Sequence, residues 1–235
     1  MENMQQLESS AVVANIYEQD GRQIVELNET IFYPQGGGQP YDQGKIENEE
    51  NIFDVQEVRF VDGIVKHIGE FKSGKFEIGE QVKLHVEPAR RALHARLHSG
   101  GHIVDMAVNS LGLEWIPGKG YHFPDGPYVE YQGSLPEDLH EREELRKNLE
   151  NKMQQFVHSG IATQITFVSI DEMKSLVRFV PDNLPENKPS RVVLYGDFGV
   201  PCGGTHVANL REIGDIKIKK LAMKNGNVKV SYLIN

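Results

Sequence analysis

The chain has 235 residues, of which 39% are hydrophobic and 25% are charged, and this composition excludes a disordered or fibrous protein. Its formal net charge of −9 at pH 7 argues against a general electrostatic grip on nucleic acid. The single cysteine excludes an internal disulfide and favours a reducing compartment, so we expect a cytoplasmic protein. No leader pattern opens the chain and no apolar run approaches the roughly 18 residues of a membrane span, so we expect no membrane partner.

Residues 1–88 are predicted to form a small β-barrel domain. Their β-rich runs are separated by turn signals such as Asp20-Gly21 and Asp62-Gly63, which gives about six short strands. No amphipathic helix interrupts these strands, and a series of strands without alternating helices favours a closed barrel.

A glycine-rich loop lies inside this barrel, where Gly36, Gly37 and Gly38 stand between two prolines and precede Gln39. Glycine backbone can adopt positive φ and approach a neighbouring group closely, so the loop can cradle a nucleotide or a substrate. A barrel corner that needs glycine for steric reasons explains the same residues equally well.

Residues 89–235 are predicted to form an α+β domain, an antiparallel sheet with two long helices on one face. Apolar residues at helical spacing predict one helix from Pro88 to Leu111 and a second from about Pro136 to Ser159. The remaining predicted elements are strands at 161–170 and 191–195, a short helix at 171–179, and a C-terminal hairpin at 215–223 and 228–234.

Three histidines follow one another at intervals of four residues along the first helix, at His94, His98 and His102. Residues at i and i+4 share a helix face, so the sequence offers two possible ligand pairs that have His98 in common. Gly100 and Gly101 each cost roughly 1 kcal/mol in a helix relative to alanine, a penalty usually offset by close packing or by room for a ligand. The glycines therefore favour the pair His98 and His102.

A second donor pair, Cys202 and His206, lies near the other end of the chain with the same spacing of four residues. Glycines between them allow both side chains to turn toward one point. Imidazole and thiolate are borderline-soft ligands that suit a tetrahedral zinc ion. We therefore expect one zinc ion per chain, held by donors from both segments.

Two further segments have a composition that allows nucleic-acid contact. The Gly-, Pro- and aromatic-rich stretch 115–131 can line a pocket in which a base stacks and Lys119 meets a phosphate, although aromatic core residues in a strand and turn are the commoner explanation. Residues 211–235 contain six basic and two acidic residues, among them Lys217, Lys219 and Lys220. These lysines suit either a phosphate backbone or a solvated hairpin face.

Three motifs resemble the editing domain of alanyl-tRNA synthetase. They are His98-Ser99-Gly100-Gly101-His102, the segment from Cys202-Gly203-Gly204-Thr205-His206 to Ile218, and the glycine-rich loop Phe32–Pro40. Together they extend over nearly the whole chain, which is too short for an aminoacylation domain. The chain therefore looks like a free-standing editing protein of the medium-length AlaX type.

The resemblance implies hydrolysis in trans of the ester that joins a wrong amino acid, serine and also glycine, to the 3′ end of alanine tRNA. It implies the zinc ligands His98, His102, Cys202 and His206, with the first three assigned to catalysis, and it makes His94 a helix-face neighbour. The implied partner is mischarged alanine tRNA, and the expected state is a monomer or a homodimer. The residues assigned to substrate are Thr30, Gly36, Gly37, Gly38, Gln39 and Lys119, and those assigned to tRNA are Lys217, Lys219 and Lys220.

The zinc ion can act in several ways. It can lower the pKa of a bound water to about 7, polarise the ester carbonyl, or hold the substrate's α-amino group. Four protein ligands leave no open position, so we expect one ligand, His206, to be loose. The family's glutamine after the histidine helix is replaced here by Pro117-Gly118-Lys119-Gly120. Thr30 is therefore our candidate partner for the serine hydroxyl.

Two other functions fit the same residues. A zinc-stabilised tRNA-binding module without catalysis would use the four donors only to join two elements. A metallohydrolase acting on a small ester would not need the basic C-terminal hairpin. The editing domain of threonyl-tRNA synthetase has similar metal motifs, but the glycine-rich loop favours the alanine branch.

Overall fold

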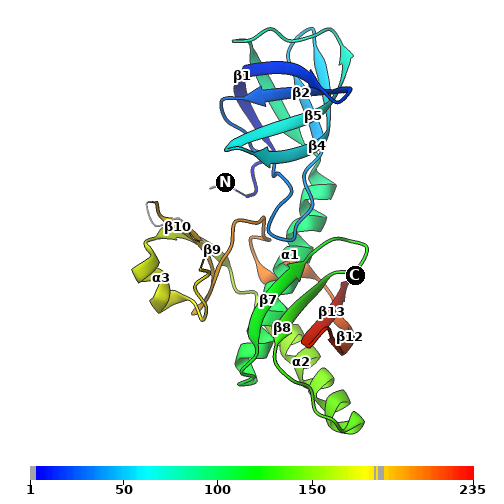
Figure 1. Cartoon of the computed structure of the whole chain (residues 1–235), viewed down its shortest axis with the longest axis vertical. Coiled ribbons are helices and arrows are strands. Elements are labelled where there is room, and N and C mark those ends of the chain that lie inside the picture. The colour runs from blue at the N-terminus through cyan, green and yellow to red at the C-terminus, as the bar shows by residue number, and fades with distance from the viewer. Residues whose placement is uncertain (1–3, 183, 185–187) are drawn as a thin grey trace. The chain divides into compact units, whose positions relative to one another are not determined.

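The computed structural model describes residues 4–182, 184 and 188–235. The chain forms two compact units, Met1–Leu93 and His94–Asn235, and each has its own hydrophobic core (Figure 1). The division falls inside helix α1 (Pro88–Ser110), whose first residue lies at the domain boundary expected from the sequence.

The first unit contains the predicted barrel, closed in the strand order β1-β2-β5-β4-β3-β6. Its strands are β1 (Glu8–Gln19), β2 (Arg22–Leu27), β3 (Gly44–Glu47), β4 (Ile52–Val61), β5 (Ile64–Ser73) and β6 (Gln81–Val86). Both Asp-Gly turns have positive φ at each residue, 54° and 72° at Asp20 and Gly21 and 51° and 83° at Asp62 and Gly63. That geometry follows the right-handed twist of a hairpin, so these turns fix the pairing of their strands.

The second unit contains two antiparallel sheets rather than the single sheet expected. One has the order β12-β13-β8-β7 and the other the order β11-β10-β9. The strands are β7 (Ile116–Tyr121), β8 (Tyr128–Gln132), β9 (Thr163–Val168), β10 (Ser190–Tyr195), β11 (Phe198–Pro201), β12 (Ile216–Lys224) and β13 (Asn227–Ile234). Strand β11 was not predicted, because it has four residues and contains glycine and proline. It pairs with β10 and gives the three-stranded sheet its edge.

The helices of the second unit are α1, α2 (Leu139–Ser159) and the short α3 (Ile170–Leu176), with a 3₁₀ turn η1 (Leu210–Ile213). Helix α2 begins three residues later than predicted because the Asp138 side chain caps it, accepting from the backbone N–H groups of His140 and Glu141. Gly160 ends it in the left-handed conformation, with φ at 67°. Within the described residues, no helix is long and apolar enough to cross a membrane.

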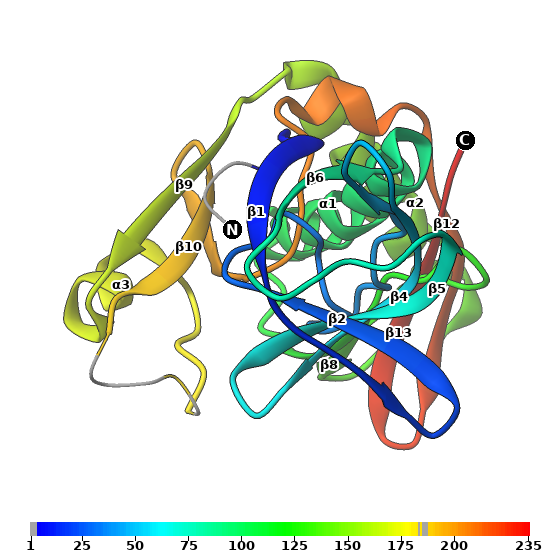
Figure 2. The same cartoon turned by 90° about the horizontal axis from the view of Figure 1, so that it is seen from above.

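Helices α1 and α2 cover one face of the four-stranded sheet and share its core, as the two views show (Figures 1 and 2). Gly100 of α1 is part of this packing. A methyl group there would approach Ile234 Cδ1 to 2.8 Å and Tyr232 Cε2 to 3.1 Å, both on β13. Close packing therefore explains Gly100 and fixes the turn of α1 that carries the histidines.

Candidate metal centre

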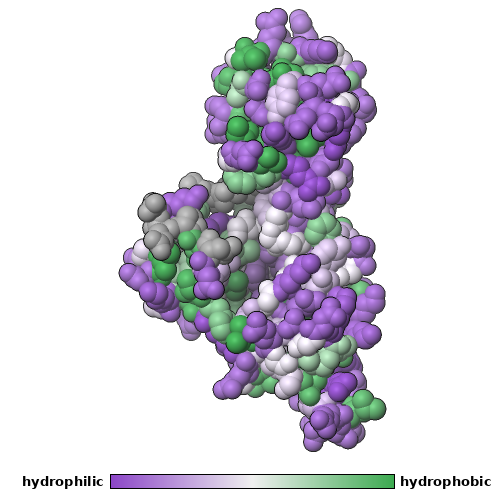
Figure 3. Space-filling view, viewed as in Figure 1, coloured by the Kyte–Doolittle hydropathy of each residue, from purple (hydrophilic) through white to green (hydrophobic). Residues whose placement is uncertain are grey.

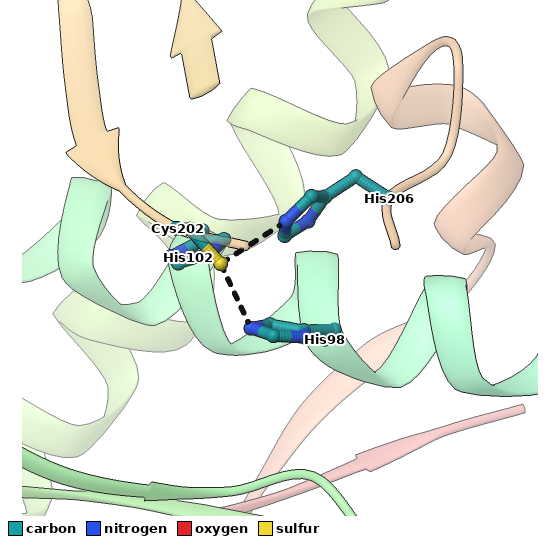
Figure 4. Close-up of side chains that lie close together, drawn as sticks. All are labelled: His98, His102, Cys202 and His206. Carbon is teal, nitrogen blue, oxygen red and sulfur yellow. Dashed lines mark hydrogen bonds between the residues drawn. The ribbon is translucent and has the colours of Figure 1, made fainter. Parts of the chain in front are cut away.

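Four donors predicted from the sequence lie together in the second unit, as Figure 4 shows. His98 and His102 extend from α1, and Cys202 and His206 belong to the segment that follows β11. Their ligand atoms all lie within 4.8 Å of one another. Sγ of Cys202 is 3.3 Å from Nε2 of His98 and 3.3 Å from Nε2 of His206. His94 is buried on α1 but is not part of this group.

Hydrogen bonds hold the segment with Cys202 against its surroundings. The Arg191 guanidinium on β10 donates to the carbonyl oxygens of Cys202 at 2.5 Å and Gly204 at 3.0 Å. The N–H of Gly204 donates to the cysteine sulfur at 3.3 Å. The N–H of Val207 donates to Oγ of Ser99 on α1 at 3.1 Å, which joins the two donor segments.

The outward nitrogens of two histidines also have partners. Nδ1 of His206 lies 3.3 Å from Oγ of Ser99 and 3.2 Å from the hydroxyl of Tyr195. Nδ1 of His102 faces a carboxylate oxygen of Asp105 at 3.5 Å. Ligating histidines are commonly oriented by such contacts at the nitrogen that does not bind the metal.

Asp105 is itself held in place by Tyr131 of β8, whose hydroxyl donates to Oδ1 at 2.5 Å. Asp105 lies three residues after His102 on α1, and this i,i+3 relation was the only trace of the contact in the sequence. The Tyr131 contact depends on the packing of β8 under the helix, so sequence spacing could not identify it.

His122 is a further histidine of the site that the sequence did not single out. Its ring stacks on that of His98, with centroids 4.4 Å apart and planes at 21°. Gly101 and Gly120 make room for it, because a methyl group at either position would collide with the ring. Its Nδ1 lies 2.7 Å from the hydroxyl of Tyr232, which donates to the Leu97 carbonyl. Gly101, the second glycine of helix α1, therefore makes room for the imidazole of His122.

Burial and neighbouring charges shift the pKa values of the cluster. Burial and the surrounding imidazoles hold the pKa of His98 and of His206 well below the ordinary value, which keeps both rings neutral. Burial also opposes the charged form of His102, but the nearby Asp105 carboxylate and Cys202 sulfur outweigh it and raise its pKa to about 9. Burial would raise the pKa of the Cys202 thiol, yet the contact with His102 lowers it. The Cys202 sulfur and the Asp105 carboxylate therefore favour a positive charge on His102.

The donor set fits a divalent metal of the zinc type. Neutral imidazole and thiolate are the forms that bind zinc, and all four side chains are donors of these two types. Nε2 of His102 is buried and has no hydrogen-bond partner of ordinary geometry among the described residues. A buried polar atom is normally paired, and a metal ion would satisfy this one.

The glycine-rich loop lies in the first unit, where hydrogen bonds hold it. Gly37 and Gly38 have φ of 54° and 75°, which glycine adopts readily. The Tyr33 hydroxyl donates to the Gly36 carbonyl at 3.0 Å, and the Tyr33 N–H donates to Asp42 at 2.6 Å. Gln39 is fully buried. The conformation of the loop therefore explains why glycines stand there. Their assignment to substrate binding stays a prediction.

Asp42 and Thr30 fix the two ends of this region within the first unit. Arg91 forms a buried ion pair with Asp42 at 2.5 Å and donates to the Ile31 carbonyl at 2.7 Å. The Thr30 hydroxyl lies 2.8 Å from Nε2 of the buried His67 and accepts from a backbone N–H at 3.1 Å. Thr30 is thus bonded within the barrel, and its contact with the serine hydroxyl stays a prediction.

The lysines assigned to nucleic acid are exposed on two strands of the four-stranded sheet. Lys119 lies on β7, and Lys217, Lys219 and Lys220 lie on β12. A bulge between Ile218 and Lys220 explains why two successive lysines face solvent on a strand whose residues otherwise alternate. Lys217 pairs with Asp215 at 3.0 Å.

Two families match separate parts of the chain. Residues 2–90 match the family described as tRNA synthetases class II (A). Residues 190–229 match the family described as threonyl and alanyl tRNA synthetase second additional domain. Cys202 and His206 lie in the second match, whereas His98 and His102 lie between the two.

Similar proteins cover almost the whole chain. The alanyl-tRNA editing protein AlaX-L of Pyrococcus horikoshii is 31% identical over 228 residues, 94% of this chain and 53% of its own length. The alanine–tRNA ligase of Leptospira borgpetersenii is 32% identical over 83% of this chain and 21% of its own length. The alanine–tRNA ligase of Methanothrix thermoacetophila is 33% identical over 90% of this chain and 22% of its own length. The chain thus spans about half of AlaX-L and about a fifth of these ligases.

Proposed function

The chain belongs to the family of alanyl-tRNA editing proteins of the AlaX type, and from this we propose that it hydrolyses the ester of mischarged alanine tRNA. The substrates we propose are the seryl and glycyl esters. The observation that carries the proposal is the convergence of His98, His102, Cys202 and His206 within 4.8 Å.

The reaction is the addition of water to the ester carbonyl, followed by cleavage of the bond between the acyl carbon and the ribose oxygen. The products are the free amino acid and the 3′-terminal hydroxyl of the tRNA, which takes up a proton. Zinc, when bound, supplies a positive charge that stabilises developing negative charge on oxygen. The four donors would hold the ion, Asp105 orients His102, and Ser99 and Tyr195 orient His206.

The ligand number separates this proposal from a second candidate, a zinc-stabilised tRNA-binding module. Four protein donors are typical of a closed structural site, and their mutual proximity favours this alternative. Catalysis that needs an open position requires one donor to be released. The expected donor is His206, but its Nδ1 is held by two hydroxyls and its ring is fully buried, which opposes its release.

A deacylation assay decides between the two candidates. Alanine tRNA charged with serine, glycine or alanine is incubated with the protein before and after treatment with a chelator. We expect release of serine and glycine but not of alanine, loss of release after chelation, and recovery when zinc is returned. Binding of the charged tRNA without release of any amino acid would overturn catalysis and support the binding module.

A small ester as the true substrate is tested in the same assay. Replacing Lys217, Lys219 and Lys220 with glutamate reverses the charge at three of the four exposed lysines of β12. Hydrolysis of charged tRNA should weaken and lose part of its salt dependence, because phosphate contacts are lost. Unchanged hydrolysis of charged tRNA, with efficient turnover of a short aminoacyl ester, would favour the small-ester hydrolase.

A further inference from the structure

The four-stranded sheet has a second face, opposite α1 and α2, which we call the outer face. Buried residues of β8 and β13 alternate with half-buried ones, so Tyr128 and Lys229 point to the outer face. The strand registers align Lys220, Ser231, Tyr128 and Tyr121 across all four strands in one row. Figure 3 shows hydrophilic residues among pale ones of intermediate hydropathy over this sheet.

Three aromatic rings form a stack on the outer face, Phe123 on Tyr121 and Tyr121 on Tyr128. The first pair has centroids 4.5 Å apart with planes at 14°, and the second has 5.3 Å and 19°. All three residues are half-buried. Nζ of Lys229 lies 3.2 Å from the centroid of Tyr128, so a cation covers one end of the stack. Stacked aromatics with a cation at their edge are a platform for unpaired nucleic-acid bases.

Four lysines, which we call the outer lysines, gather around this stack: Lys119, Lys220, Lys224 and Lys229. Partial burial and the charges of the other three lower the pKa of Lys229, and Glu130 alone acts in the opposite direction. The chain as a whole carries a net charge of −9, so this cluster runs against its overall charge. Such a cluster is complementary to a phosphate backbone.

The outer face and the metal centre lie on opposite sides of one chain segment. Tyr121 and Phe123 belong to the aromatic stack, whereas His122 between them stacks on His98 at 4.4 Å. Side chains alternate along an extended segment, which explains this division. The aromatic stack and the ring that packs on His98 are therefore carried by neighbouring residues of one segment.

We propose that the outer face binds single-stranded RNA, with an unpaired base extending the aromatic stack at its Phe123 end and phosphates held by the outer lysines. The inference rests on the proposed function in one respect, because it assigns the unpaired 3′ end of the tRNA substrate to this face. The three lysines predicted from the sequence only partly coincide with this surface. Lys220 is common to both sets, whereas Lys217 is paired with Asp215.

The test measures binding of a fluorescently labelled single-stranded RNA, and of the same sequence as a duplex, by anisotropy at several salt concentrations. One variant combines Tyr121→Leu and Tyr128→Leu, which removes the rings that support Phe123 in the stack but keeps apolar bulk. A second combines Lys220→Gln, Lys224→Gln and Lys229→Gln. The matched control combines Lys75→Gln, Lys83→Gln and Lys147→Gln, which removes the same charge from exposed lysines elsewhere. Trp115 fluorescence and zinc content verify that each variant is folded.

We expect the tyrosine variant to bind the single strand at least about fivefold more weakly, with the duplex unaffected. The lysine variant should reduce the slope of log K against log salt by about 2, because three phosphate contacts are lost. The control should match the wild type. Equal weakening of duplex and single strand by the tyrosine variant, or equal slopes in the lysine and control variants, would overturn the inference.

The same proteins are tested for deacylation, which separates the two proposals. Binding that depends on the outer face, without hydrolysis of any charged tRNA, would remove the proposed function and leave this inference standing. Hydrolysis by the wild type, with single-strand affinity unchanged in both outer-face variants, would remove this inference and leave the function standing.

Discussion

Each unit buries histidine, but in contrasting surroundings. In the barrel, His67 is fully buried with a partner at each ring nitrogen, the Val25 carbonyl at 2.9 Å and the Thr30 hydroxyl at 2.8 Å. In the second unit, the rings of His98 and His206 lie 4.6 Å apart and those of His102 and His206 4.9 Å apart. Three imidazoles thus face one another and a thiolate, instead of single protein partners.

The difference separates a histidine with a structural role from histidines that could hold a metal ion. A buried ring with both nitrogens bonded adds specificity to a core and has no need of an ion. In the second unit the rings converge on one point. Among the described residues, the buried Nε2 of His102 has no hydrogen-bond partner of ordinary geometry, and a cation at that point would satisfy it. The comparison therefore predicts that the two histidine sites respond to different perturbations, the second to metal removal and the first to acid.

The largest effect is expected from His102→Ala. This change removes one of four donors, and since loss of an orienting contact alone costs 10–100-fold in metal affinity, loss of a ligand should cost more. We expect zinc content to fall well below one ion per chain and deacylation to fall at least about a hundredfold. Elemental analysis of the purified protein measures the first quantity, and release of serine from charged tRNA measures the second.

His140→Ala is the matched control, because His140 is an exposed histidine on α2 outside the metal centre. It should keep its zinc and its activity. Cys202→Ser provides a second route if His102→Ala folds poorly, since cobalt bound to the wild type should show a thiolate charge-transfer band that this variant lacks. Full zinc content and activity in both variants would contradict the assigned ligands.

A smaller effect is expected from acid acting on His67. Burial lowers its pKa to about 4, against 6.5 as the ordinary value, although the Val25 carbonyl and Glu26 oppose the shift. Between these values the unfolded chain binds a proton that the folded chain does not, so stability falls as pH falls from 6.5 to 4. The full loss is about 3 kcal/mol, and below pH 4 this contribution is constant.

Urea unfolding between pH 7 and pH 4 measures this loss, and His67→Gln should flatten the dependence relative to the wild type. His140→Gln should keep the wild-type slope, because that side chain is exposed. If His67→Gln fails to fold, the His67 ring resonance of the wild type gives the same information. A ring titration near pH 6.5 would show that burial does not exclude the proton.

The fold followed closely from local patterns, and its departures have local causes. The barrel was predictable because Asp-Gly turns determine hairpin geometry and no helix interrupts the strands. The three-stranded sheet was not, because β10 pairs with β9 and with the short β11 rather than with the C-terminal hairpin. Pairing between distant strands leaves no period in the sequence.

The grouping of the four donors was predictable, because two pairs at a spacing of four residues, one of them on a helix, can each direct both side chains to one point. Their supports were not. Asp105 meets His102 only because Tyr131 of β8 holds it, and His122 reaches His98 only through gaps at Gly101 and Gly120. These contacts come from packing between elements. The sequence shows one aromatic residue on each side of His122. This order separates the aromatic stack from the metal centre only if the segment is extended, which the structure shows.

The smallest predicted change tests Thr30, the barrel residue that the sequence linked to substrate. The Val25 carbonyl can only accept, so Nδ1 of the neutral His67 carries the hydrogen and Nε2 accepts from the Thr30 hydroxyl. The same oxygen accepts from the Phe32 N–H. The one hydrogen of the Thr30 hydroxyl is thus committed, and a serine hydroxyl could only donate to the remaining lone pair of its oxygen.

Thr30→Val should therefore lower the free energy of unfolding by about 1–2 kcal/mol, as measured in urea. Thr30→Ser should restore it. If Thr30 also reads the substrate, Thr30→Val alone should reduce the preference for seryl over alanyl ester, and an unchanged preference would confine Thr30 to the barrel.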